Sequence, residues 1–407
     1  MDRSRLQEYA TLLAKKGVAV IPGEEVWINA NLDQVEFVRM VVEECYKAGA
    51  KKVRVRFSDN KISRLSYEYM ALKDLKKVPE YTISEYRYMV KNLPSVLHII
   101  SDDPDAFKGI KQSTLSKSSL AVRKKIKPYR NKMDGKYKWC IAAVPSKEWA
   151  NIIFPKLKEE DREDALWEAI LNTCRVDGKA VQNWDKHNEN LSNKCKALNE
   201  MDLQYLEYKS SNGTDFKVEL IKGIRWGGGA ELTSDKRIFN PNIPSEEVFT
   251  SPLSGSCEGL LVASKPLSYN GQLIDGFSIR FKDGKVSEVK AKKNQKLLEQ
   301  MVSMDDGAGK LGEVALVPFD SPISNSGLLF YETLFDENAA CHVALGAGFK
   351  ELLPNGENVT TEEAKKLGLN DSMIHVDFMI GASDLEIVGT SFSGKKTVIF
   401  KNGNWAF

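Results

Sequence analysis

The sequence predicts a mixed α/β and α+β protein of two domains, with the boundary between residues 202 and 203. The chain has 407 residues, enough for two domains with a sizeable core. Helix-like and strand-like patterns alternate before residue 200, and short alternating segments separated by Gly and Pro follow. We therefore expect a mostly parallel sheet in domain 1–202 and a β-rich domain with helices over 203–407.

The first domain opens with apolar residues at helical spacing over 5–16, followed by strand-like alternation over 25–30. Helical periodicity over 34–48 ends at Gly49, and a second alternating segment follows at 53–57. A strand, a helix and a strand in this order favour parallel pairing with the helix on one face. Two further strands and two further helices are predicted over 96–100, 139–144, 163–174 and 181–199.

The second domain begins with a hairpin pattern. Alternating segments at 203–208 and 215–220 flank the turn at Asn212-Gly213. A second pair, 276–281 and 285–289, turns at Asp283-Gly284. Antiparallel strands are therefore expected here.

Composition narrows the classes of partner and compartment. Hydrophobic residues make up 42% and charged residues 28% of the chain, and the net charge is +2, so no polyanionic partner is indicated. The basic segment 108–138 contains few aromatic residues and is interpreted as a solvated helix face, not a nucleic-acid site. No apolar stretch resembles a signal peptide or a membrane span, and the six cysteines form no C-x-x-C pair. We expect a cytoplasmic chain with reduced thiols, and neither nucleic acid nor membrane as a partner.

Candidate metal ligands gather in the last third of the chain. The sequence has only four histidines, and His342 and His375 both have carboxylates nearby. His375 and Asp377 are two residues apart in a strand-like segment, so both side chains point to one face while Val376 and Phe378 pack on the other. Buried ionisable groups need a partner or a metal, and this pair is therefore interpreted as a ligand pair.

Three more residues complete the candidate set. His342 is expected in a helix that starts near Asp336, where small residues allow close approach. Taken alone, it is as consistent with a core histidine as with a ligand. Glu313 stands at the start of a predicted strand, and Glu247 where a loop enters another. A single glutamate is usually a surface residue, so the interpretation depends on the whole set.

Other hydrolytic and nucleotide-binding chemistries lack their motifs. The sequence contains no G-x-S-x-G, no H-E-x-x-H and no G-x-x-x-x-G-K-[ST]. Gly227-Gly228-Gly229 lacks the strand-to-helix context of a dinucleotide turn. Cys341 is not expected to pair with the adjacent His342, because neighbouring helix residues point apart.

The motifs resemble those of the thermophilic-type metalloaminopeptidases (metallopeptidase family 29), the family of aminopeptidase T, aminopeptidase S and PepS. The family patterns, all present here in order, are N-x-P-[ST]-E-E-[VI]-[FY]-T, L-G-E-x-A, T-L-[FY]-D-E-N-A-x-x-H-x-A-x-G and H-x-D-[FW]-M-I-G. Secondary matches near the start of the chain, at 213–216, at 264–267 and at 403–406 extend the resemblance over essentially its whole length.

This resemblance implies a metal-dependent aminopeptidase that releases N-terminal residues from short peptides. It also implies a homodimer and two divalent ions per chain, of zinc, cobalt or manganese. The implied ligands are Glu247, Glu313, His342, His375 and Asp377. Glu247 and Glu313 are also candidates for proton transfer, and which carboxylate bridges the two ions is left open.

One position departs from the family pattern. A tyrosine is expected seven residues after the motif histidine, and this chain has Phe349 there. Loss of one donor to a forming oxyanion typically costs about 10²–10³ in turnover. We therefore expect a slower or differently selective peptidase. The alternative is a metal- or peptide-binding pseudoenzyme on the same scaffold.

Overall fold

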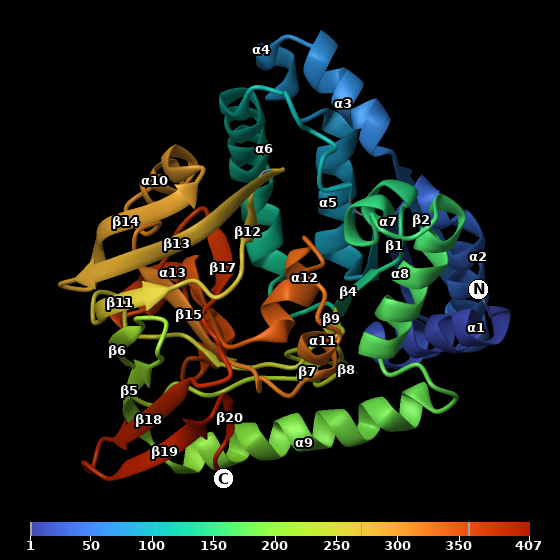
Figure 1. Cartoon of the computed structure of the whole chain (residues 1–407). Coiled ribbons are helices and arrows are strands. Elements are labelled where there is room, and N and C mark those ends of the chain that lie inside the picture. The colour runs from blue at the N-terminus through green and yellow to red at the C-terminus, as the bar shows by residue number, and fades with distance from the viewer. Residues whose placement is uncertain (1, 102, 270, 357–358) are drawn as a thin grey trace. The chain divides into compact units, whose positions relative to one another are not determined.

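The computed structural model describes residues 2–101, 103–269, 271–356 and 359–407. The chain forms two compact units, one of residues 1–186 with 230–244 and the other of residues 187–229 with 245–407 (Figure 1). It thus passes from one unit to the other three times. The domain boundary expected after residue 202 falls inside the second unit, which begins at residue 187, and it stays a prediction.

The first unit contains a five-stranded sheet in which every pair is parallel, and the predicted α/β fold class is confirmed. In sheet order the strands are β2 (Lys52–Ser58), β1 (Glu25–Asn31), β3 (Ser95–Ile100), β4 (Trp139–Ala143) and β9 (Asn242–Ile243). The predicted strands at 25–30, 53–57, 96–100 and 139–144 correspond to the first four.

Helices connect these strands and supply most of the unit's aromatic contacts. Tyr9 stacks on Phe37 at a ring-centroid distance of 5.3 Å, and Phe37 meets the edge of Trp167 at 5.3 Å, so the first, second and eighth helices pack together. The helices are α1 (Arg3–Leu12), a π-helix (Leu13–Gly17), α2 (Val35–Lys47), α3 (Asn60–Tyr69), α4 (Leu72–Leu75), α5 (Glu80–Asn92), α6 (Gln112–Met133), α7 (Lys147–Ile153) and α8 (Glu159–Thr173). The basic segment predicted as a solvated helix forms α6, on which Arg123, Lys124 and Lys125 are exposed.

The segment 230–244 returns to the first unit after the chain has begun the second. It contains a short antiparallel pair, β7 (Glu231–Leu232) and β8 (Ile238–Phe239), and then β9. The Asn240 N–H donates to the carbonyls at the end of the π-helix, and β9 pairs with β4.

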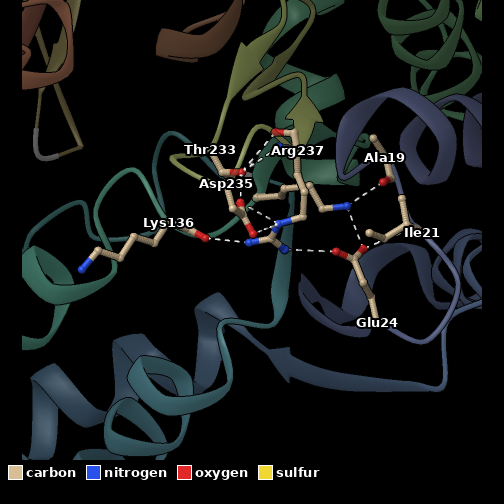
Figure 2. A network of polar contacts seen from close by, with 8 residues as sticks. Ala19, Ile21, Glu24, Lys136, Thr233, Asp235 and Arg237 are labelled. Carbon is tan, nitrogen blue, oxygen red and sulfur yellow. Dashed lines mark hydrogen bonds and ion pairs between the residues drawn. The ribbon is translucent and has the colours of Figure 1, made fainter. Parts of the chain in front are cut away.

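A network of hydrogen bonds and ion pairs connects this segment with residues 19–24 and 136–138 (Figure 2). The Glu24 carboxylate lies 3.1 Å from the Arg237 guanidinium, which also donates to the Lys136 carbonyl at 2.7 Å. The Lys138 ammonium donates to Glu24 at 2.7 Å and to the Ala19 carbonyl at 2.6 Å. The Lys138 side chain is fully buried, so these partners replace the hydration that it loses.

The second unit contains two antiparallel sheets, as expected for a β-rich domain. The larger follows the order β12 (Leu267–Tyr269), β13 (Gln272–Lys282), β11 (Glu258–Val262), β6 (Asp215–Glu219), β5 (Leu203–Lys209), β18 (Glu386–Ser391), β19 (Lys396–Lys401) and β20 (Asn404–Trp405), with β14 (Lys285–Lys293) paired to β13. The smaller has the order β10 (Val248–Thr250), β15 (Leu311–Leu316), β16 (His342–Gly346) and β17 (His375–Met379).

One hydrophobic core joins the two sheets. It includes Leu206 and Ile279 from the larger sheet and Val314, Val343 and Phe378 from the smaller, all buried. The remaining elements are α9 (Ala180–Glu200), α10 (Gln295–Val302), α11 (Pro322–Asn325), α12 (Thr333–Asp336), α13 (Thr361–Lys366) and 3-10 turns at Glu337–Ala339 and Lys350–Leu352. Within the described residues, no helix combines the length and the apolar character required to cross a membrane.

Candidate metal centre

The four-stranded sheet places the sequence-predicted residues at one site. Glu313 lies on β15, His342 opens β16, His375 and Asp377 lie on β17, and Glu247 directly precedes β10. The five come from segments up to 130 positions apart, and the sheet register brings together the four that lie on strands.

The register explains why these side chains share a face. Glu313 pairs with Ala344, and Ala344 pairs with Asp377, so the three residues form one row across the sheet. Directly paired residues in antiparallel strands point to the same side. The alternate residues Val314 and Val343 point into the core. One face of this sheet is therefore apolar and the other carries the ionisable groups.

The helix predicted around His342 is wrong. The helical part ends at Ala339, and His342 begins a strand that is paired on both sides, with Ala315 and with Met379. The small residues that suggested a close helix contact instead allow close strand packing. Gly346 has φ +111°, and a Cβ there would lie 2.0 Å from the Ile374 carbonyl oxygen.

Glu247, Glu313 and His342 form a first group, the Glu247 group, in which one ligand-type atom from each residue lies within 4.8 Å of the others. The His342 Nε2 is 3.0 Å from a Glu247 oxygen. Its Nδ1 lies 3.1 Å from the Ala340 carbonyl oxygen, which accepts the Nδ1 proton and leaves Nε2 facing the carboxylates.

Glu313, His375 and Asp377 form a second group, the Asp377 group, with the same 4.8 Å limit. The His375 Nε2 lies 3.0 Å from Glu313 and 3.4 Å from Asp377. Its Nδ1 is held by the Ala347 carbonyl at 2.7 Å, so both histidines are oriented in the same way. The His375 side chain is 30% exposed, which leaves this group open to solvent on one side.

The ionisable side chains of the two groups lie close together, and their charges shift one another's pKa values. Burial raises the pKa of Glu313 to about 8, and the charges of Asp377 and Glu247 add to that effect. Burial opposes protonation of His342, but Glu247 outweighs it and raises the pKa to about 9. Burial likewise opposes ionisation of Asp377, but the neighbouring His375 lowers its pKa to about 2.

These residues fit a divalent cation. Asp377 Oδ1 is buried, and among the described residues it accepts no well-aligned hydrogen bond; the His375 Nε2, 3.4 Å away, is the cationic group beside it. A cation supplies what such an oxygen lacks, and neutral imidazole with carboxylate is a donor set suited to zinc, cobalt or manganese.

Glu337 is a site residue that the sequence reasoning missed. Burial raises the pKa of its carboxyl well above the ordinary value, and the charges of Asp377, Glu247 and Glu313 raise it further. Its carboxyl is therefore coupled electrostatically to carboxylates of both groups. The available signal was its position in the same Asp-Glu-Asn-Ala run that leads to His342.

Phe349 lies beside the Asp377 group. Its ring meets the His375 ring edge-on at a centroid distance of 5.1 Å and the Phe249 ring at 4.8 Å. The Phe349 N–H donates to the Ser251 hydroxyl at 2.8 Å. The position that departs from the expected tyrosine is therefore in contact with a candidate ligand.

Two groups of side chains that can hold divalent cations lie on one face of the sheet. A site of this kind is typical of a metalloenzyme. Residues 2–405 match the family described as thermophilic metalloprotease (M29), and the chain belongs to that family and is a peptide-bond hydrolase. Aminopeptidase AmpS of Bacillus subtilis is 38% identical over 99% of this chain and 98% of its own length. Aminopeptidase T of Thermus thermophilus is 35% identical over 99% and 98%. The solved structure of wild-type AmpT from Thermus thermophilus is similar over the whole of both chains, with 34% identity and a TM-score of 0.92.

Proposed function

We propose that this protein is a dinuclear aminopeptidase that removes N-terminal residues from short peptides. The curated relatives are named aminopeptidases, which supports this specificity within the metalloprotease family. Two divalent ions per chain, zinc, cobalt or manganese, are held by Glu247, Glu313, His342, His375 and Asp377.

The observation that carries the proposal is the double membership of Glu313. This carboxylate belongs to both the Glu247 group and the Asp377 group. A carboxylate has two oxygens and can serve two cations at once. Glu313 would therefore contribute to holding both ions, and its burial to 3% exposure keeps it from rotating into solvent.

When bound, a pair of divalent ions supplies an activated water at neutral pH and polarises the scissile carbonyl. The residues of the chain set the geometry for that chemistry. Ala340 and Ala347 carbonyls hold the two imidazoles in the tautomer that presents Nε2.

Glu337 is the better candidate for proton transfer than Glu247 or Glu313. Those two belong to the ligand groups, whereas Glu337 belongs to neither group. The charges of carboxylates in both groups raise the pKa of its carboxyl. In its ionised form, a carboxyl in that position would take a proton from the attacking water and return it to the leaving amine.

A panel of short peptides tests the proposal. Chelator-stripped protein is reloaded with zinc, cobalt or manganese and given peptides with free or acetylated N-termini. We expect cleavage of free N-termini only, returning only with metal. Cleavage that is indifferent to the N-terminus would contradict the aminopeptidase assignment.

A metal- or peptide-binding pseudoenzyme is the alternative, and Phe349 is the observation that favours it. A phenyl ring beside His375 has no hydroxyl to offer a substrate oxygen. Two tightly bound ions per chain without hydrolysis of any peptide in the panel would support this alternative.

A homodimer is part of the proposal, and an apolar stripe on α3 supports it. Ile62, Leu65 and Tyr69 are spaced along one face of this helix and are 63%, 51% and 83% exposed. Exposed apolar groups at this spacing are typical of an association surface. Light scattering should give twice the 45.6 kDa chain mass, and Leu65→Lys should shift it towards the monomer.

We also propose a cytoplasmic location. All six cysteines are free and buried, which agrees with a reducing compartment. Fractionation of cells that express the tagged chain tests this location.

A further inference from the structure

The segment that carries Glu247 is not paired in a sheet at the residue itself or at the two residues before it. Residues 245–247 lie between β9 and β10 and belong to no helix or strand. The position of Glu247 therefore depends on contacts from neighbouring segments. On one side Gly228 lies so close that a Cβ there would be 2.5 Å from the Glu247 carbonyl oxygen.

Two buried polar side chains of the second unit also contact this segment. The His187 Nε2 lies 2.7 Å from the Ser245 carbonyl oxygen. The Asn338 Oδ1 accepts the Glu246 N–H at 2.7 Å. Because Glu246 precedes Glu247 directly, the Asn338 bond acts on the peptide unit next to the candidate ligand.

The Asn338 amide also reaches the other side of the site. Its Nδ2 donates to the Leu334 carbonyl at 2.9 Å and to a Glu337 carboxylate oxygen at 3.4 Å. Asn338 is fully buried, and its single acceptor oxygen and both amide hydrogens are engaged. One side chain thus connects the backbone beside Glu247 with the carboxylate of Glu337.

We propose that Asn338 is a positioning residue for the Glu247 group, holding the Glu247 segment and the Glu337 carboxylate in a fixed relation. The inference rests on the proposed dinuclear function and adds a residue to it. Only a short side chain with one acceptor and two donors satisfies all three partners, so asparagine suits the position and aspartate or leucine does not.

The proposal makes a site-selective prediction. Asn338 accepts directly from the backbone beside Glu247 at 2.7 Å, whereas its link to the Asp377 group runs through the longer 3.4 Å contact with Glu337. The Asp377 group is itself built from strand-paired residues on β15 and β17. Loss of Asn338 should therefore weaken the binding of one of the two ions. Removing a residue that orients ligands typically lowers metal affinity by about 10–100-fold.

The test uses the full chain, stripped of metal and titrated with cobalt(II) against a competing chelator. Affinity and visible absorption are recorded for both binding steps. For Asn338→Ala we expect one step to weaken about 10–100-fold with a changed absorption band, while the other step keeps its affinity. Asn338→Asp retains an acceptor for the Glu246 N–H and should fold more readily. It should lose less affinity than Asn338→Ala, because the bond to the Glu247 segment persists.

Asn183→Asp is the matched control. Asn183 donates to a backbone carbonyl at 3.1 Å and to a carboxylate at 2.7 Å, the same two kinds of acceptor, but in the first unit. It should leave both cobalt affinities unchanged even if it lowers the unfolding temperature.

Unchanged affinities and spectra in both Asn338 variants would overturn the inference, as would an equal weakening of both steps in a folded variant. A wild-type chain that binds fewer than two cobalt ions would instead refute the dinuclear proposal. The two failures are therefore distinguishable.

Discussion

Glu313 and Asp377 occupy one row of their sheet with Ala344 between them. Ala344 is fully buried, and its methyl group is the only side-chain volume between the two carboxylates in that row. A small residue here lets both carboxylates converge on one region. The separation of the ligands therefore depends on a residue that itself has no ligand atom.

Enlarging this residue should obstruct the metal centre. For Ala344→Leu we expect loss of at least one bound ion and a destabilisation of about 1–3 kcal/mol from overpacking. Metal content and the free energy of unfolding are measured together. Val343→Leu enlarges a neighbour that points into the core, so it should cost similar stability and retain both ions. Full metal content in Ala344→Leu would show that the row is not part of the centre.

Metal content should distinguish the shared carboxylate from the residues that serve one group. We expect Glu313→Gln to lose both ions, and His342→Ala or Asp377→Ala to lose one, because only Glu313 belongs to both groups. Peptidase activity should fall to the level of metal-stripped protein in all three. Elemental analysis of folded variants gives the stoichiometry, with Glu299→Gln on α10 as the control. Retention of one ion by Glu313→Gln would argue against bridging.

Phe349→Tyr should raise turnover. The new hydroxyl would extend from a ring that already contacts His375, where it could donate to a substrate oxygen as charge develops. We expect kcat to increase by up to about 10²–10³ with little change in metal affinity. Phe249→Tyr adds the same hydroxyl to the neighbouring ring and should have a smaller effect. An unchanged kcat in Phe349→Tyr would show that the position does not take part in the reaction.

Asp305 should make stability depend on pH. Burial opposes its ionisation, but hydrogen bonds from the Met373 N–H, the Ser372 hydroxyl and two more backbone N–H groups outweigh this and lower its pKa. A carboxyl with a lowered folded-state pKa stabilises the fold fully above its unfolded value, near 3.8, and loses that contribution as pH falls through the folded-state pKa.

Asp305→Asn should therefore lower the unfolding temperature most near neutral pH, and the difference from wild type should shrink in acid. Thermal unfolding between about pH 3 and 7 measures it. The neighbouring exposed Asp306→Asn is the control. A constant difference across this range would show that ionisation of Asp305 contributes nothing. The effect bears on the site because Asp305 holds the residues that lead into β17.

The parallel sheet was predictable because its first four strands have clear periodicity and lie between recognisable helices. β9 was not, because a strand of two residues has no pattern, and its pairing with β4 is a tertiary contact. His342 was assigned to a helix because the alanine and glycine residues around it suggest helix packing. In the structure this segment pairs with β15 on one side and β17 on the other, so it is a strand.

The candidate site shows the same division between local and long-range information. The spacing of His375 and Asp377 on one strand face is local and could be predicted. The row through Ala344 and the contact of Asn338 with the Glu246 N–H depend on register and on loop packing. Glu337 was within reach of motif reasoning, but only its coupling to the other carboxylates distinguishes it from a surface glutamate.

The return of residues 242–243 to the edge of β4 has a consequence for biosynthesis. A ribosome delivers the chain from its N-terminus, and an N-terminal domain usually folds as soon as it has emerged. Here the five-stranded sheet lacks its last strand until translation has passed residue 243, by which time part of the second unit has already been made. A nascent chain stalled at residue 202 would present the open edge of β4, where chaperones could act and mispairing could start.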